Sequence, residues 1–118
     1  LNIARLAREE ARNLSYGQKK LMDLAALLMS NPRIILLDEP AGGVNPTLLA
    51  SIVEHIHELN RRGLTVLIVE HNMNLVMEIS HNVVVMAYGT VIAEGNPSKI
   101  QDDPSVLEAY LGGGRTDD

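Results

Sequence analysis

The sequence predicts an α/β fold, with a mainly parallel sheet flanked by helices and a β-hairpin near the C-terminus. Short apolar runs alternate with longer segments of helical period, which is typical of parallel strands joined by helical crossovers. The first run, Ile34–Asp38, has four consecutive apolar residues and predicts a strand buried on both faces. Tyr88-Gly89 separates two further apolar runs, which predicts a tight hairpin turn.

Length and composition indicate one ordinary globular domain. The chain has 118 residues, 46% of them hydrophobic, and a formal net charge of −5. The acidic balance argues against nucleic-acid binding, for which a basic face is expected. Without cysteine there is neither a disulfide framework nor thiolate chemistry. The chain starts with Leu inside a predicted helix, so we expect it to be a piece of a longer protein.

The N-terminal part predicts two helices ahead of the first strand. Apolar residues recur on one face of residues 2–12, which predicts a short amphipathic helix. Ser15 is a favourable N-cap and predicts a second helix over residues 16–29. Ser30-Asn31-Pro32 then predicts the helix end, and the strand Ile34–Asp38 follows.

The middle of the chain predicts a helix, a strand and a shorter helix. Asn45 caps a helix and Pro46 is tolerated at its first position, so the pair predicts a helix over residues 46–62. A second apolar strand is expected at Thr65–Val69, followed by a short helix over residues 72–79.

The C-terminal part predicts the hairpin and two small helices. The hairpin strands are expected at Val83–Ala87 and at residues 91–94. Asn96-Pro97 and Asp103-Pro104 each predict the start of a helix, the second ending near Tyr110. We expect residues 1–111 to form the domain and residues 112–118 to be a disordered tail.

The ends of the first two strands carry the strongest candidate site. The carboxyl ends of parallel neighbours meet at one edge of a sheet, so we expect Asp38 and Glu39 to lie near Glu70 and His71. Two adjacent acids there suit Mg²⁺ and a group that activates water. A strand that ends in an acidic turn is the structural alternative. The remaining histidines have no such context and are interpreted as structural.

A second candidate site is the predicted helix start at Ser15. Free N–H groups, the positive end of the helix dipole, the Ser15 hydroxyl and a glycine at position 17 suit an anion such as phosphate. A plain N-cap is the structural alternative.

These motifs, in this order and spacing, resemble the ATP-binding subunits of ABC transporters, which have a P-loop NTPase-type fold. Leu14-Ser15-Tyr16-Gly17-Gln18 is similar to the LSGGQ signature, with Tyr in place of the first glycine. Ile34–Asp38 resembles the Walker B strand, and Glu39 the acid that follows it. Residues 41–45 lie where the family has its D-loop, and His71 where it has its switch histidine.

The likeness is strongest to the branched-chain amino acid subclass. It rests on the stretch Asp38-Glu39-Pro40-Ala41-Gly42-Gly43-Val44-Asn45-Pro46 and on the ending from Glu94 to Gly112. The D-loop ends in Asn45 where most members have Asp. No G-x-x-x-x-G-K-[ST] occurs in the chain, so the resemblance is to the C-terminal portion of the domain, without the Walker A half.

The resemblance implies ATP and Mg²⁺ as cofactors and ATP hydrolysis as the activity of the complete protein. Asp38 would hold Mg²⁺ through water, Glu39 would polarise the attacking water, and His71 would contact the γ-phosphate. Ser15, Gly17 and Gln18 would bind the ATP of the opposite subunit in a head-to-tail dimer. Asn45 would contact that subunit through the D-loop.

The implied function is an ATPase subunit that energises an importer, for branched-chain amino acids. Its implied partners are a second ATPase subunit, identical or not, transmembrane permease subunits and, indirectly, an external solute-binding protein. The implied location is cytoplasmic, on the inner face of the cell membrane. Without the phosphate loop, we expect the chain alone to be inactive. A lipopolysaccharide-export ATPase and a non-catalytic α/β interaction module remain alternatives.

Overall fold

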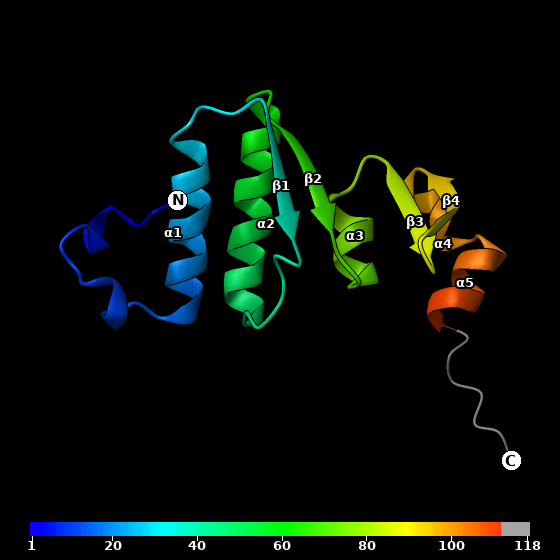
Figure 1. The fold of residues 1–118 in the computed structure, drawn as a ribbon, viewed down its shortest axis with the longest axis horizontal. Helices are drawn as coiled ribbons and strands as arrows, with labels where there is room; N and C mark the ends of the chain where they lie inside the picture. The colour runs from blue at the N-terminus through cyan, green and yellow to red at the C-terminus, as the bar shows by residue number, and fades with distance from the viewer. Residues whose placement is uncertain (112–118) are drawn as a thin grey trace, which may run out of the picture. The chain divides into compact units, whose positions relative to one another are not determined.

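The computed structural model describes residues 1–111, which form two compact units, Leu1–Glu70 and a second unit that starts at His71 (Figure 1). The predicted tail at 112–118 lies outside the described residues. In chain order the elements are η1 (Ala4–Leu6), η2 (Ala11–Asn13), α1 (Tyr16–Leu28), β1 (Ile34–Asp38), α2 (Pro46–Arg61), β2 (Thr65–Val69), α3 (Met73–Ile79), β3 (Val83–Ala87), β4 (Thr90–Gly95), α4 (Pro97–Gln101) and α5 (Pro104–Leu111).

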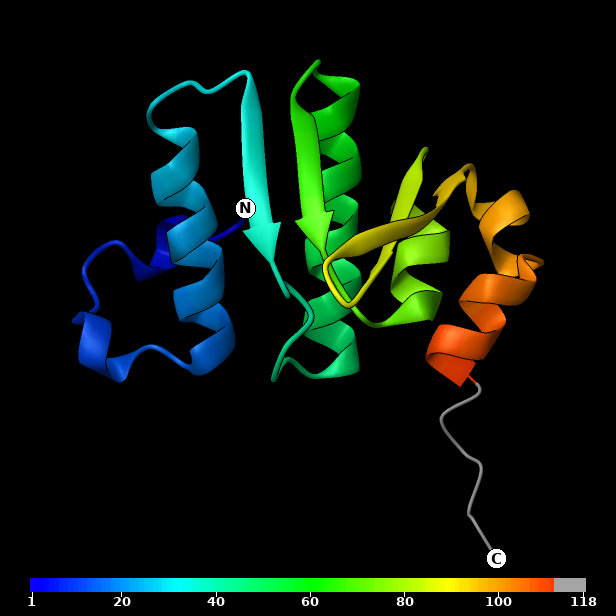
Figure 2. The ribbon, with the colours of Figure 1, turned by 45° about the vertical axis from the view of Figure 1, so that its right-hand side comes forward.

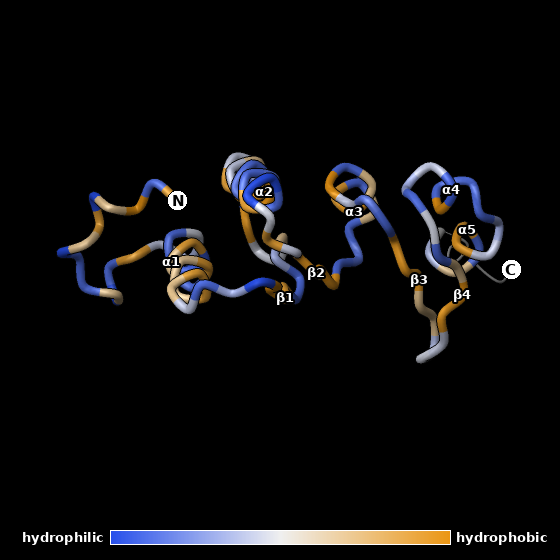
Figure 3. The backbone as a smooth tube through the Cα atoms, turned by 90° about the horizontal axis from the view of Figure 1, so that it is seen from above, coloured by the Kyte–Doolittle hydropathy of each residue, from blue (hydrophilic) through white to orange (hydrophobic). Residues whose placement is uncertain are grey.

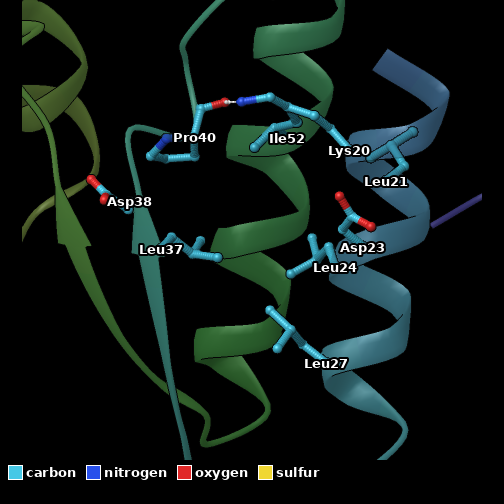
Figure 4. A pocket seen from close by; sticks show the side chains of 9 residues that line it. All are labelled: Lys20, Leu21, Asp23, Leu24, Leu27, Leu37, Asp38, Pro40 and Ile52. Carbon is cyan, nitrogen blue, oxygen red and sulfur yellow. Dashed lines mark hydrogen bonds between the residues drawn. The ribbon is translucent and has the colours of Figure 1, made fainter. Parts of the chain in front are cut away.

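The first unit is a two-stranded parallel sheet with two helices on one side. Strands β1 and β2 pair in register from Ile34 opposite Thr65 to Asp38 opposite Val69. Helices α1 and α2 both lie on the same side of β1 (Figure 4). The core between them includes Leu24, Ile35 and Leu64. The predicted parallel pairing of the first two strands is therefore confirmed.

The prediction that the first strand is buried on both faces is wrong. Ile35 is only 4% exposed, whereas Leu36, which points to the other face, is 67% exposed. The reason is that α1 and α2 cover one face of the sheet, whereas no helix or strand of the first unit covers the other face. The apolar character of both strands is evident in Figure 3.

The predicted helix over residues 2–12 is also not formed. The structure has two separate 3₁₀ turns there, η1 and η2, and neither contains a buried residue. A helix of this length is marginal in water unless its apolar face packs against something. Ile3 and Leu6 are only half-buried, so packing supplies too little to keep the segment in one helix.

The second unit is an antiparallel hairpin with three short helices (Figure 2). Tyr88 and Gly89 have φ values of 49° and 77°, which is the backbone of a type I′ turn and confirms the predicted hairpin. The core consists of Val83 and Val85 from β3 with Ile100 from α4 and Val106 from α5. None of the helices within residues 1–111 has the length and apolarity needed to cross a membrane.

Candidate functional site

Asp38 ends β1 on the uncovered face of the sheet. Its carboxylate points away from α1 and α2, whereas the preceding Leu37 points towards them (Figure 4). Asp38 is exposed and lies opposite Val69 in the β-ladder. The alternation of the strand thus places this acid on the side that is open to solvent and ligand.

Glu39 continues the ladder and then turns the chain sharply. Its N–H donates to the carbonyl of Val69 at 2.8 Å, and its own carbonyl accepts the N–H of Gly42 at 2.9 Å. Its φ is 47°, in the left-handed region that non-glycine residues rarely adopt. Such backbone strain persists only where surrounding contacts impose it, and it occurs often at functional sites. Two backbone hydrogen bonds impose it here.

The predicted meeting of the two strand ends is confirmed by the bond from Glu39 to Val69. Glu70 follows β2 directly and ends the first unit. His71 is exposed and is the first residue of the second unit. That His71 meets Glu39 stays a prediction.

The acids suit a magnesium ion that is bound partly by phosphate groups. They do not form a metal site made of protein ligands alone. Within residues 1–111 no group of three or more His, Cys, Asp or Glu side chains is arranged to hold a metal. Mg²⁺ commonly binds through one or two carboxylates while keeping water and substrate phosphates as its other ligands. The exposed Asp38 carboxylate is suited to that kind of binding.

The start of α1 is a capping box built by Ser15 and Gln18. The Ser15 Oγ accepts the N–H of Gln18 at 3.1 Å, and the Gln18 Oε1 accepts the N–H of Ser15 at 2.9 Å. Both side chains act here as acceptors, so the Ser15 hydroxyl proton and the Gln18 amide protons remain available as donors. The N–H groups of Tyr16 and Gly17 belong to the first turn, where a helix provides no intrahelical acceptor. The site can therefore offer several donors to an anion.

Gly17 has a packing role that the sequence did not reveal. A Cβ at this position would lie 2.0 Å from the Leu48 Cδ2 atom of α2. The glycine therefore allows the first turn of α1 to approach α2. Its backbone N–H is unaffected by this contact.

The turn that follows Glu39 ends at the cap of α2. The Asn45 Oδ1 accepts the N–H of Leu48 at 2.8 Å, which confirms the predicted N-cap. Pro46 occupies the first helical position as expected. The contact of Asn45 with a partner subunit stays a prediction.

Tyr16 and Lys20 have contacts that sequence reasoning missed. The Tyr16 hydroxyl donates to the carbonyl of Gly42 at 3.2 Å, and Lys20 Nζ donates to the carbonyl of Pro40 at 3.5 Å. The available signal was the tyrosine in the signature-like motif, with a lysine one helical turn later.

A cavity of about 180 Å³ lies behind these contacts, between α1, α2 and the end of β1 (Figure 4). Leucine side chains from α1 and Leu37 form much of its wall. Ligand pockets for drug-sized molecules are roughly 300–1,000 Å³, so this cavity is too small to enclose a nucleotide.

Two family models match the chain. One, described as "Branched-chain amino acid ATP-binding cassette transporter", matches residues 90–116. The other, described as "AAA domain, putative AbiEii toxin, Type IV TA system", matches residues 5–78, which is more than half of the chain.

Curated relatives with similar sequences are named branched-chain amino acid transport ATP-binding proteins. The chain is 42% identical to the high-affinity branched-chain amino acid transport ATP-binding protein BraF of Pseudomonas aeruginosa, over 95% of this chain and 44% of BraF. It is 43% identical to the probable branched-chain amino acid transport ATP-binding protein LivG of Archaeoglobus fulgidus, over 95% of this chain and 44% of that protein. A crystal structure of a nucleotide-free ATP-binding cassette from an ABC transporter superimposes with a TM-score of 0.84 at 38% identity, covering 92% of this chain and 44% of that one.

The fold is that of part of a domain of the P-loop NTPase fold class. More narrowly, the chain belongs to the family of ABC transporter ATP-binding proteins, with its likeness in the branched-chain amino acid subclass. It spans less than half the length of the curated relatives that it matches.

Proposed function

We propose that the complete protein containing this chain binds and hydrolyses ATP as a subunit of an ABC importer for branched-chain amino acids. The observation that carries this proposal is the pair of acids at the end of β1, one of them held in a strained backbone by hydrogen bonds at the carboxyl edge of a parallel pair. The names of the relatives, branched-chain amino acid transport ATP-binding proteins, support the substrate class.

The chemistry would depend on positioning and charge rather than on covalent catalysis. Asp38 would hold Mg²⁺, which neutralises charge on the phosphate oxygens when it is bound. Glu39 would accept a hydrogen bond from the attacking water and so orient and polarise it. Because two backbone hydrogen bonds hold Glu39 at the end of the ladder, its side chain extends from a fixed backbone position. His71 would contact the γ-phosphate.

The start of α1 would serve a second copy of the domain. Ser15 and Gln18 retain donor protons outside the capping box, and Gly17 offers its backbone N–H. These groups would bind the γ-phosphate of ATP held by the opposite subunit, with Asn45 in contact with that subunit. ATP would then hold the head-to-tail dimer together, and hydrolysis would release it.

The remaining partners follow from the proposed role. The subunit would associate with transmembrane permease subunits at the inner face of the cell membrane, and an external solute-binding protein would deliver the amino acid. The chain by itself lacks a G-x-x-x-x-G-K-[ST] loop, so we propose that it neither binds ATP tightly nor hydrolyses it.

The test of the proposal is Glu39→Gln in the complete protein. The amide keeps the shape of the side chain but is a poor base, so turnover is expected to fall by about 10²–10⁴-fold while ATP binding is retained. ATP hydrolysis and nucleotide affinity are measured on the same preparation. Glu54→Gln, on the exposed side of α2, is the matched control and should hydrolyse ATP normally. Undiminished hydrolysis by Glu39→Gln would remove this acid from the role.

A further inference from the structure

We propose that Tyr16 and Lys20 form a latch that holds the 40–43 turn against the start of α1. Both residues are then positioning residues. They hold the signature-like helix start and the turn after Glu39 together as one rigid piece. The inference deepens the proposed function and rests on it for its catalytic consequence. The contacts themselves lie wholly within the first unit.

The tyrosine makes two contacts with the turn. Its hydroxyl donates to the carbonyl of Gly42 at 3.2 Å. Its ring lies against Gly43, where a Cβ would come within 3.1 Å of the Tyr16 Cε1 atom. Gly43 has a φ of 71°, so glycine suits this position both for its backbone and for the approach of the ring.

The lysine closes the other end of the turn. Lys20 lies one helical turn after Tyr16, on the same face of α1. Its Nζ is 5.4 Å from the centroid of the Tyr16 ring, within the range of a cation–π contact, and reaches the carbonyl of Pro40 at 3.5 Å (Figure 4). The two side chains therefore engage carbonyls at both ends of the turn.

The turn that they hold begins at the strained acid. The carbonyl of Glu39 accepts the N–H of Gly42, the residue whose own carbonyl receives the Tyr16 hydroxyl. A continuous set of hydrogen bonds thus runs from the start of α1 through Gly42 to the backbone of Glu39. Loosening it should disturb the geometry of the acid and the turn, without touching groups that bind nucleotide directly.

The first test is Tyr16→Phe in the complete protein, which removes the hydroxyl and keeps the ring. Deuterium uptake in peptides covering residues 38–46 should rise. The kcat for ATP hydrolysis should fall about three- to tenfold, as expected for one hydrogen bond, while the KM for ATP stays within about twofold. Tyr16→Ala, which also removes the ring contacts, should give larger changes in the same directions.

The matched control is Tyr88→Phe. Tyr88 is fully exposed at the hairpin turn of the second unit, so loss of its hydroxyl should change neither uptake nor kcat. The latch is overturned if Tyr16→Phe matches Tyr88→Phe in both measurements, or if KM rises while kcat is unchanged. If the complete protein hydrolyses no ATP, the proposed function fails alone, and deuterium uptake at 38–46 still decides whether the latch exists.

Discussion

Single backbone positions determine how closely the parts of the first unit approach one another. Gly17 has no Cβ, and the Leu48 Cδ2 atom lies 2.0 Å from where a Cβ would be. At Glu39 a carboxylate residue takes a left-handed φ of 47° because both its N–H and its carbonyl are engaged. The contact at Gly17 and the bond from the Glu39 N–H to Val69 both involve distant residues, whereas the bond from Gly42 to the Glu39 carbonyl is local.

The Gly17 contact predicts that the effect of Gly17→Ala on the unfolding free energy depends on whether Leu48 is present. Gly→Ala inside a helix usually stabilises by about 1 kcal/mol. Overpacking usually costs about 1–3 kcal/mol, so Gly17→Ala should lower the unfolding free energy while Leu48 is present. In a Leu48→Ala background the same change should be neutral or stabilising. Urea unfolding of the four variants of a double-mutant cycle measures the coupling, and simple additivity would contradict the packing role of Gly17.

Helix starts are the elements that the local sequence specifies best. Ser15, Asn45, Asn72 and Asn96 each accept the backbone N–H three residues further on, at the starts of α1 to α4. In two of these helices proline occupies the first turn, where its missing N–H has no cost. Such caps need only residues close in sequence, which explains why the helix starts predicted from Ser15, Asn45 and Asn96 agree with the structure.

The cap of α2 gives a prediction at this scale. Asn45→Ala removes the acceptor for the Leu48 N–H and should cost about 1 kcal/mol of unfolding free energy. Asn45→Asp keeps an acceptor and adds a negative charge at the helix N-terminus, so it should preserve or slightly raise stability. Thermal unfolding compares the two variants. Asn74→Ala, at an exposed position within α3, is a control that should not be destabilising, and equal losses from Asn45→Asp and Asn45→Ala would contradict the cap.

At the scale of the whole molecule, the main feature is the uncovered face of the β1–β2 sheet. Its exposed apolar side chains are Ile34, Leu36, Leu67 and Val69. The first unit holds only two strands in this sheet, so strand edges are open as well. Exposed apolar patches and open strand edges favour association with other surfaces.

We therefore expect the isolated 118-residue chain to self-associate through this face. Changing Leu36 and Leu67 together to Gln should shift its sedimentation towards the monomer, because the two residues are opposite each other in the ladder and lie at the centre of the face. Met29→Gln is the matched control, since Met29 is 85% exposed but lies at the end of α1. A monomeric unsubstituted chain at high concentration would contradict this expectation.

The sequence by itself determined the class of fold, most helix and strand positions, and the family. Apolar runs specified β1, β2 and β3, and Tyr88-Gly89 specified the hairpin turn. The acids at the end of β1 and the cap at Ser15 were located in the same way. These features depend on side chains that are neighbours along the chain, so periodicity and turn chemistry suffice to predict them.

Only the tertiary structure decided which surfaces are covered and which distant groups touch. It showed that Leu36 is exposed, that residues 2–12 do not form one helix, and that Glu39 is left-handed. It also showed that the Tyr16 hydroxyl reaches Gly42, twenty-six residues away. The physical reason is that burial, strain and long-range hydrogen bonds depend on what packs against each segment, and no local pattern of residues contains that information.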